Sequence, residues 1–115
     1  MHGGLAMTAG MTPRIDGTLY RTGRIGAEVS HEDAATCVRI STGNALAVLE
    51  EALGGLDRIE RCLRMTVYLS GAPDFVSHSA IADAGSALLR ERLGERGQPV
   101  RTAVGAHTLP GGSPV

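Results

Sequence analysis

The residues best suited to chemistry lie near the carboxyl end of the chain, around Arg101. A strand is expected over Val100–Thr108, and alternate residues of a strand share a face. That face carries Arg101 together with Ala103, Gly105 and His107. An arginine among such small neighbours can present its planar fork to a carboxylate, a charge-assisted pairing worth roughly 1.5–3 kcal/mol. The segment predicts a carboxylate anchor; the alternative is a strand-end arginine that pairs with an acidic residue across a subunit interface.

Composition narrows the class of ligand. The 115-residue chain has 11 basic residues, all of them arginine, so a lysine Schiff base and a lysine-anchored pyridoxal phosphate are excluded. The net charge is −1 and the aromatic residues are two tyrosines and one phenylalanine, which offers neither a basic surface nor a stacking platform for nucleic acid. Apolar runs are too short to span a membrane. We therefore expect a small-molecule partner, with no nucleic acid and no membrane.

Metal and cofactor motifs are missing from the sequence. The four histidines are scattered, and neither His-Glu-x-x-His nor Cys-x-x-Cys occurs. No glycine-rich phosphate motif and no defensible Ser-His-Asp set can be placed. We expect no metal and no cofactor. Cys37 and Cys62 are expected to be reduced, and because no leader sequence is visible the expected location is cytoplasmic.

Local signals define the elements of the first half of the chain. Leu5–Gly10 predicts a short buried strand that ends at glycine. Within Arg14–Tyr20, an Asp-Gly pair predicts a hairpin turn before a second strand. Ser30 is the predicted N-cap of a helix that ends at Gly54-Gly55. Its apolar face is expected to include Ala34, Val38, Ser41, Ala45, Val48 or Leu49, and Ala52.

The second half predicts a strand over Arg61–Leu69, a helix from Gly71–Asp74 to Gly94, and the Arg101 strand. A turn at Leu109–Gly112 follows, and a further strand would begin at Ser113–Val115, where it is cut short. The order strand-strand-helix-strand-helix-strand predicts one α+β domain over residues 1–115. It is a two-layer sandwich with one sheet and two helices on one face. The open sheet face predicts self-association.

The carboxyl-terminal segment resembles a known family. Pro99-x-Arg101-Thr102-x-Val104 followed by Leu109-Pro110 resembles the signature of the RidA/YjgF family of reactive-intermediate (imine/enamine) deaminases. The same order of fragments continues along the chain. Leu5–Gly10 looks like the family's x-I-x-x-S-G strand, Asn44–Glu50 like its first helix, Leu56–Ile59 with Thr66–Leu69 like its central strand, and Pro73–Phe75 like its second helix entry.

This resemblance implies a chorismate-mutase-like fold and a homotrimer with ligand clefts between subunits, without a cofactor. It implies hydrolysis of 2-imino or 2-enamino acids to 2-keto acids and ammonia, with Arg101 as the catalytic anchor of the substrate carboxylate. Backbone groups near Ala103 and Gly105 are expected to line the cleft. Ala9 joins them as a ligand-binding position because it matches the family's serine.

Several positions depart from the family pattern. Ala9 replaces that serine, and Ala103 stands where the deaminases often have cysteine. The family's asparagine falls within Ser79–Asp83, its N-terminal aromatic has no match, and its water-positioning glutamate would follow Val115. These departures favour the alternative of a trimeric small-carboxylate binding protein without turnover. A ribonuclease activity, also attached to the family, is disfavoured by the charge balance.

Overall fold

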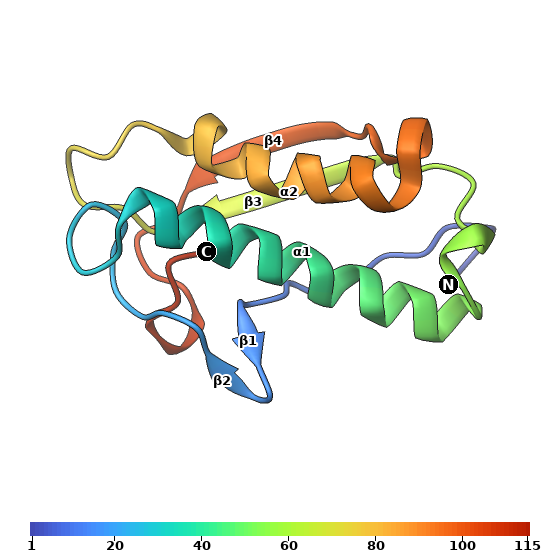
Figure 1. The fold of residues 1–115 in the computed structure, drawn as a ribbon, viewed down its shortest axis with the longest axis horizontal. Coiled ribbons are helices and arrows are strands. Elements are labelled where there is room, and N and C mark those ends of the chain that lie inside the picture. Colours follow the sequence, from blue (N-terminus) through green and yellow to red (C-terminus); the bar gives the residue numbers. More distant parts are fainter.

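The computed structural model describes residues 1–115 and has two layers, with both helices packed on one face of a parallel strand pair (Figure 1). Its strands and helices are β1 (Arg14–Ile15), β2 (Thr18–Leu19), α1 (His31–Leu53), β3 (Arg64–Leu69), α2 (His78–Leu93) and β4 (Val100–Gly105). The predicted α+β class and the order of elements from β1 onward are confirmed. The prediction of one sheet is wrong, because β1–β2 and β3–β4 form two separate two-stranded sheets.

The predicted Asp-Gly hairpin is confirmed. β1 and β2 pair antiparallel, with Arg14 opposite Leu19 and Ile15 opposite Thr18. Asp16 (φ 51°) and Gly17 (φ 82°) both adopt the left-handed conformation that a two-residue hairpin turn requires.

The strand predicted over Leu5–Gly10 is wrong. The segment has no ladder, and its side chains are exposed, with Met7 91% and Leu5 54% accessible. The chain is tied to α1 just beyond this segment, where the Asn44 amide donates to the carbonyl oxygens of Thr12 and Arg14. An apolar run forms a strand only where a partner strand satisfies its backbone, and none lies beside this one.

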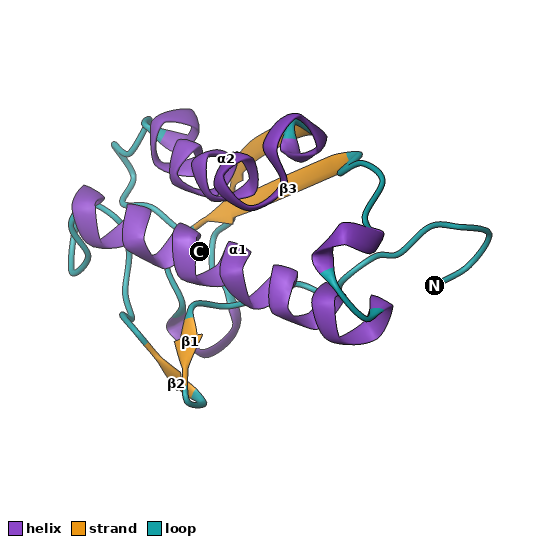
Figure 2. Cartoon of the chain, turned by 45° about the vertical axis from the view of Figure 1, so that its right-hand side comes forward, coloured by secondary structure: helices purple, strands orange, loops and turns teal.

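Both ends of α1 are capped as predicted. The Ser30 hydroxyl accepts a hydrogen bond from the Asp33 N–H at 3.0 Å, and Gly54 closes the helix with φ 87°. The buried face begins as predicted at Ala34 and Val38 but then continues through Thr42 and Leu46. Of the alternatives Val48 and Leu49, Leu49 is the half-buried one, whereas the predicted position Ala52 is wrong because it is exposed. α2 determines this face, because α1 packs along it (Figure 2).

Loss of the α1 cap should destabilise the fold. Ser30→Ala leaves the Asp33 N–H without its side-chain acceptor and is expected to lower the free energy of unfolding by about 1 kcal/mol. Urea denaturation followed by circular dichroism measures the change. Ser77→Ala is the matched control, because Ser77 is the N-cap of α2 but makes no side-chain cap hydrogen bond. Equal losses in the two variants would contradict the capping role of Ser30.

β3 and β4 run parallel, and their register aligns Met65 with Arg101, Val67 with Ala103 and Leu69 with Gly105. Side chains of β3 alternate between its two faces, and Val67 and Leu69 are buried beneath the helices. The opposite face is open, with Tyr68 53% and Val100 69% exposed.

Several element ends differ from prediction. β3 begins at Arg64 rather than Arg61, and β4 ends at Gly105 rather than Thr108. β4 stops because the chain turns away after the Ala106 N–H donates to the Leu69 carbonyl. The last residues are extended and buried beside the end of β3, where the Ser70 N–H donates to the Pro114 carbonyl at 2.8 Å. No helix is long and apolar enough to cross a membrane.

The core lies between the helices and β3. Its central cluster consists of Ile25, Val29, Ala34, Cys37, Val38, Val67, Leu69, Ile81, Ala82 and Val115. α1 and α2 approach closely at Gly85, where an added Cβ would lie 2.7 Å from the Thr42 hydroxyl and 3.0 Å from Val38. This packing fixes α2 over β4 and so positions the residues of the candidate site.

Candidate functional site

The carboxyl ends of the two parallel strands and the starts of both helices lie at the same end of the molecule (Figure 1). An open groove lies there, between the start of α2 and the end of β4. It has a volume of about 530 Å³. One wall is the segment Val76–Ala80 at the start of α2, and the other is Ala103–Gly105 of β4. Four of the eight lining residues are hydrophobic and none is acidic or basic apart from His78, so the groove suits a small ligand with a neutral side chain.

Arg101 lies on the α2 side of β4 and is held by that helix. Its Nη1 donates to Asp83 Oδ1 at 2.8 Å and to Ser86 Oγ at 2.9 Å. Its Nη2 donates to the carbonyl of Ser79, a groove residue, at 3.3 Å. Arg101 is paired with an acidic residue, as one alternative supposed, but that residue belongs to the same chain rather than to a subunit interface.

The ion pair is asymmetric in exposure. The Arg101 side chain is 21% accessible, whereas that of Asp83 is 71% accessible. Three of the five guanidinium N–H groups have protein acceptors, which leaves the Nε side of the fork without one. The arrangement can therefore hold the guanidinium in a fixed orientation and still offer N–H donors to a second carboxylate.

The structure brings three of the four predicted site residues together. Arg101, Ala103 and Gly105 share the face of β4 beneath α2, and the last two line the groove. Ala9 does not join them, because it lies in the exposed N-terminal segment and lines neither the groove nor the smaller pocket described below. His107, expected on the Arg101 face, lies beyond the end of β4.

Thr22-Gly23 fits the family pattern better than Leu5–Gly10 does. The run from Leu19 to Gly23 begins at the last residue of β2 and reads apolar-x-x-Thr-Gly, with threonine in place of the family's serine. Gly23 donates its N–H to the Gly112 carbonyl at 2.8 Å, so the segment is held against the carboxyl-terminal turn. This segment begins at a strand, whereas Leu5–Gly10 forms none.

A second, smaller pocket lies beside this segment. Its volume is about 230 Å³, and its lining is polar, with Leu109 as the hydrophobic residue. Here Arg24 Nη2 lies 3.4 Å from both Nδ1 and the carbonyl of His107, while Glu28 accepts from the Arg24 N–H. His107 therefore lines this pocket rather than the groove.

His78 is a groove residue that sequence reasoning missed as a site. It is the first residue of α2, and its ring lies against Phe75 with centroids 4.6 Å apart. A Cβ placed on Gly105 would lie 3.1 Å from His78 Nε2. The available signal was Gly105 itself, because a glycine inside a strand often marks the close approach of another group.

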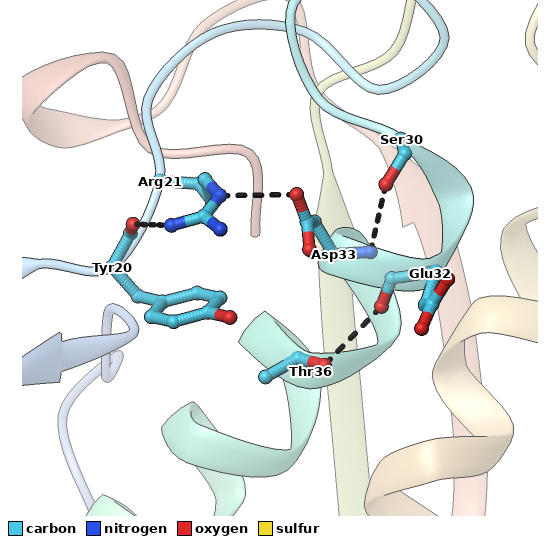
Figure 3. A network of polar contacts seen from close by, with 6 residues as sticks. All are labelled: Tyr20, Arg21, Ser30, Glu32, Asp33 and Thr36. Atoms are coloured by element: carbon cyan, nitrogen blue, oxygen red, sulfur yellow. Dashed lines mark hydrogen bonds and ion pairs between the residues drawn. The ribbon is translucent and has the colours of Figure 1, made fainter.

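A polar network holds the start of α1 to the hairpin (Figure 3). Arg21 Nε donates to Asp33 Oδ2 at 3.0 Å, and the guanidinium lies over the Tyr20 ring at 4.2 Å. The hydrogen bond with Asp33 raises the pKa of Arg21. The network fastens β2 to the helix that begins beside the groove.

The two thiols are unsuited to nucleophilic chemistry. Both cysteines are free. Burial raises the pKa of Cys37 to about 11 and also raises the pKa of Cys62. A thiol with such a pKa stays protonated near neutral pH and is a weak nucleophile. No group of three or more His, Cys, Asp and Glu side chains is arranged to hold a metal ion.

The fold and the groove together define a small protein of the chorismate-mutase-like class, with its site at the strand ends between α2 and β4. The chain belongs to the family described as "YjgF/chorismate mutase-like, putative endoribonuclease", which matches residues 1–113. The family predicted from the Arg101 segment is thereby confirmed.

Relatives support the assignment. Protein TCP17 from Trypanosoma cruzi is 31% identical over 108 residues, which cover 93% of this chain and 68% of that protein. The crystal structure of Atu1372, a protein of unknown function from Agrobacterium tumefaciens, matches with a TM-score of 0.89 and 30% identity, covering 92% of this chain and 68% of the other. A "putative endoribonuclease" from Shewanella oneidensis also matches with a TM-score of 0.89, at 31% identity, covering 92% and 70%.

Proposed function

We propose that this protein hydrolyses small 2-imino or 2-enamino acids to 2-keto acids and ammonia in the groove between α2 and β4. The observation that carries the proposal is the placement of Arg101. Its guanidinium is fixed on the groove residue Ser79 and has N–H donors to spare for a substrate carboxylate. Imine hydrolysis needs chiefly an anchored substrate, a positioned water and a proton-transfer group, and an arginine beside a small groove can supply the first of these.

The proposal includes a homotrimer in the cytoplasm, with the groove completed by a neighbouring subunit. The open face of the β3–β4 sheet supports self-association, because Tyr68, Val100 and Val104 are 53%, 69% and 40% exposed there. The two free cysteines suit a reducing compartment.

The alternative is a protein that binds a small carboxylate without turning it over. The Arg101–Asp83 pair favours it, because the arginine charge is already partly neutralised, and no carboxylate side chain lines the groove. An RNA substrate, as the family description suggests, fits less well with a net charge of −1 and no lysine.

Turnover distinguishes these candidates. 2-Aminoacrylate generated in situ should release pyruvate faster with the wild-type protein than in buffer, and Arg101→Ala should abolish most of that acceleration because the carboxylate loses its anchor. Keto-acid release is followed by a coupled dehydrogenase assay. Arg90→Ala, at an exposed position of α2, is the matched control and should retain the wild-type rate. Saturable Arg101-dependent binding of pyruvate without any acceleration would select the binding protein instead.

A further inference from the structure

His78 is the titratable side chain that lines the groove, and it is held there on two sides. Its ring packs on Phe75 with centroids 4.6 Å apart and planes at 51°. On its other side lies Gly105, where an added Cβ would be 3.1 Å from Nε2 and 3.9 Å from Cδ2. Phe75 and Gly105 thus fix the orientation of the imidazole at the N-terminal end of α2.

The ring nitrogens of His78 have no protein partner, which distinguishes it from the histidine of the smaller pocket. No side-chain or backbone group hydrogen-bonds to His78 Nδ1 or Nε2, whereas His107 Nδ1 lies 3.4 Å from Arg24 Nη2. Because Gly105 lacks a Cβ, Nε2 can be reached from the groove. A neutral imidazole has one donor and one acceptor nitrogen, so it can accept a proton from a water and later return it.

We infer that His78 is the proton-transfer residue of the groove, acting on the water that attacks the substrate anchored by Arg101. This inference rests on the proposed hydrolysis. Ser79 links the two groups: it follows His78 in the groove wall, and its carbonyl accepts the hydrogen bond from Arg101 Nη2 at 3.3 Å. No acidic side chain lines the groove to compete for the role.

The reaction balances with His78 as a shuttle. Water attacks C2 of the iminium while His78 takes one of its protons, and the C=N π electrons move to nitrogen to give a neutral carbinolamine. The imidazolium then protonates the amine. The C–N bond breaks as the hydroxyl oxygen forms the C=O bond, and the hydroxyl proton passes through His78 to the departing ammonia. Iminium and water thus give the 2-keto acid and ammonium, and His78 returns to its starting state.

Titratable and charged side chains lie near His78 on two sides. From α1, His31 meets the edge of the same Phe75 ring, with centroids 5.5 Å apart. From α2 and β4, the Asp83–Arg101 ion pair adjoins Ser79. A residue that shuttles a proton must be neutral when it accepts and charged when it donates, so the rate should depend on pH.

The test compares His78→Gln with the wild type in the keto-acid release assay. Glutamine keeps a polar side chain but cannot shuttle a proton, so kcat should fall about 100-fold while KM stays within about threefold. The variant should also lose the pH dependence of kcat that the wild type shows. His31→Gln is the matched control, because His31 also begins a helix and touches Phe75 but does not line the groove; its kcat and profile should match the wild type.

A second variant shields the imidazole without removing it. Gly105→Ala places a methyl group against Nε2 and should lower kcat while circular dichroism stays unchanged. If the wild type accelerates release and His78→Gln keeps its kcat and pH profile, the role of His78 is overturned and the proposed hydrolysis stands. If the wild type gives no acceleration at all, the hydrolysis itself is overturned, and the role of His78 with it.

Discussion

Replacing Arg101 by glutamine is expected to weaken binding of pyruvate about 10- to 100-fold. A charge-assisted hydrogen-bond pair is worth about 1.5–3 kcal/mol, and each 1.4 kcal/mol changes an equilibrium constant about tenfold. Isothermal titration calorimetry measures the dissociation constants. Arg101→Lys keeps the positive charge but loses the planar fork, so it should recover only part of the affinity. Since Arg101 also fastens β4 to α2, the variants are compared at temperatures where circular dichroism shows them folded.

Asp83 should affect the same equilibrium in the opposite direction. Its carboxylate competes with a ligand for the guanidinium, and its side chain is 71% exposed, so the pair is easily displaced. Exposed ion pairs contribute about 0.2–1 kcal/mol, and Asp83→Asn should therefore strengthen pyruvate binding about two- to fivefold at most. The gain should vanish when Arg101→Gln is also present, because the two residues share one interaction. Weaker binding by Asp83→Asn would instead mean that Asp83 orients the guanidinium productively.

Local chemical signals account for the parts of the fold that could be predicted. The hairpin follows from Asp16-Gly17, whose left-handed conformations few other residue pairs supply. The limits of α1 follow from a serine that satisfies an N–H and a glycine that adopts positive φ. The pattern around Arg101 predicted that this residue lies in a strand, and it lies in β4. Each of these features is encoded within a few residues of the chain.

Features that depend on distant partners could not be predicted. Leu5–Gly10 has the composition of a buried strand but lacks a neighbour to pair with. The Arg101–Asp83 pair joins residues 18 apart and depends on how α2 lies across β4. His78 becomes a groove residue only because Phe75 and Gly105 meet at the start of α2. In each case the decisive information is a contact between elements rather than the type of one residue.

Gly97 makes a close contact with the backbone of another element, the carbonyl group of Leu89 in α2. Gly97→Ala is therefore expected to lower the free energy of unfolding by about 2–3 kcal/mol. A Cβ at Gly97 would overlap the carbonyl oxygen of Leu89 and lie 2.7 Å from its carbonyl carbon. These atoms belong to the backbone of α2, so the helix or the linker must move rather than a flexible side chain. The same linker is held at Arg96, whose carbonyl accepts from the Cys62 N–H at 2.8 Å and whose guanidinium donates to the Ile59 carbonyl.

Movement of this linker would also shift β4, which begins three residues after Gly97 and carries Arg101. Gly97→Ala should therefore lower the thermal midpoint by roughly 10 °C and weaken pyruvate binding even at temperatures where the variant is folded. Gly43→Ala is the matched control: it lies inside α1, where a Cβ would be 3.7 Å from Leu88, an ordinary contact. Alanine in a helix interior is favoured over glycine by about 0.5–1 kcal/mol, so this variant should be as stable as the wild type or more so. If Gly97→Ala unfolds at the wild-type midpoint, the close contact with Leu89 does not constrain the linker, and the position of Arg101 must be fixed by its bonds to Asp83, Ser86 and Ser79 alone.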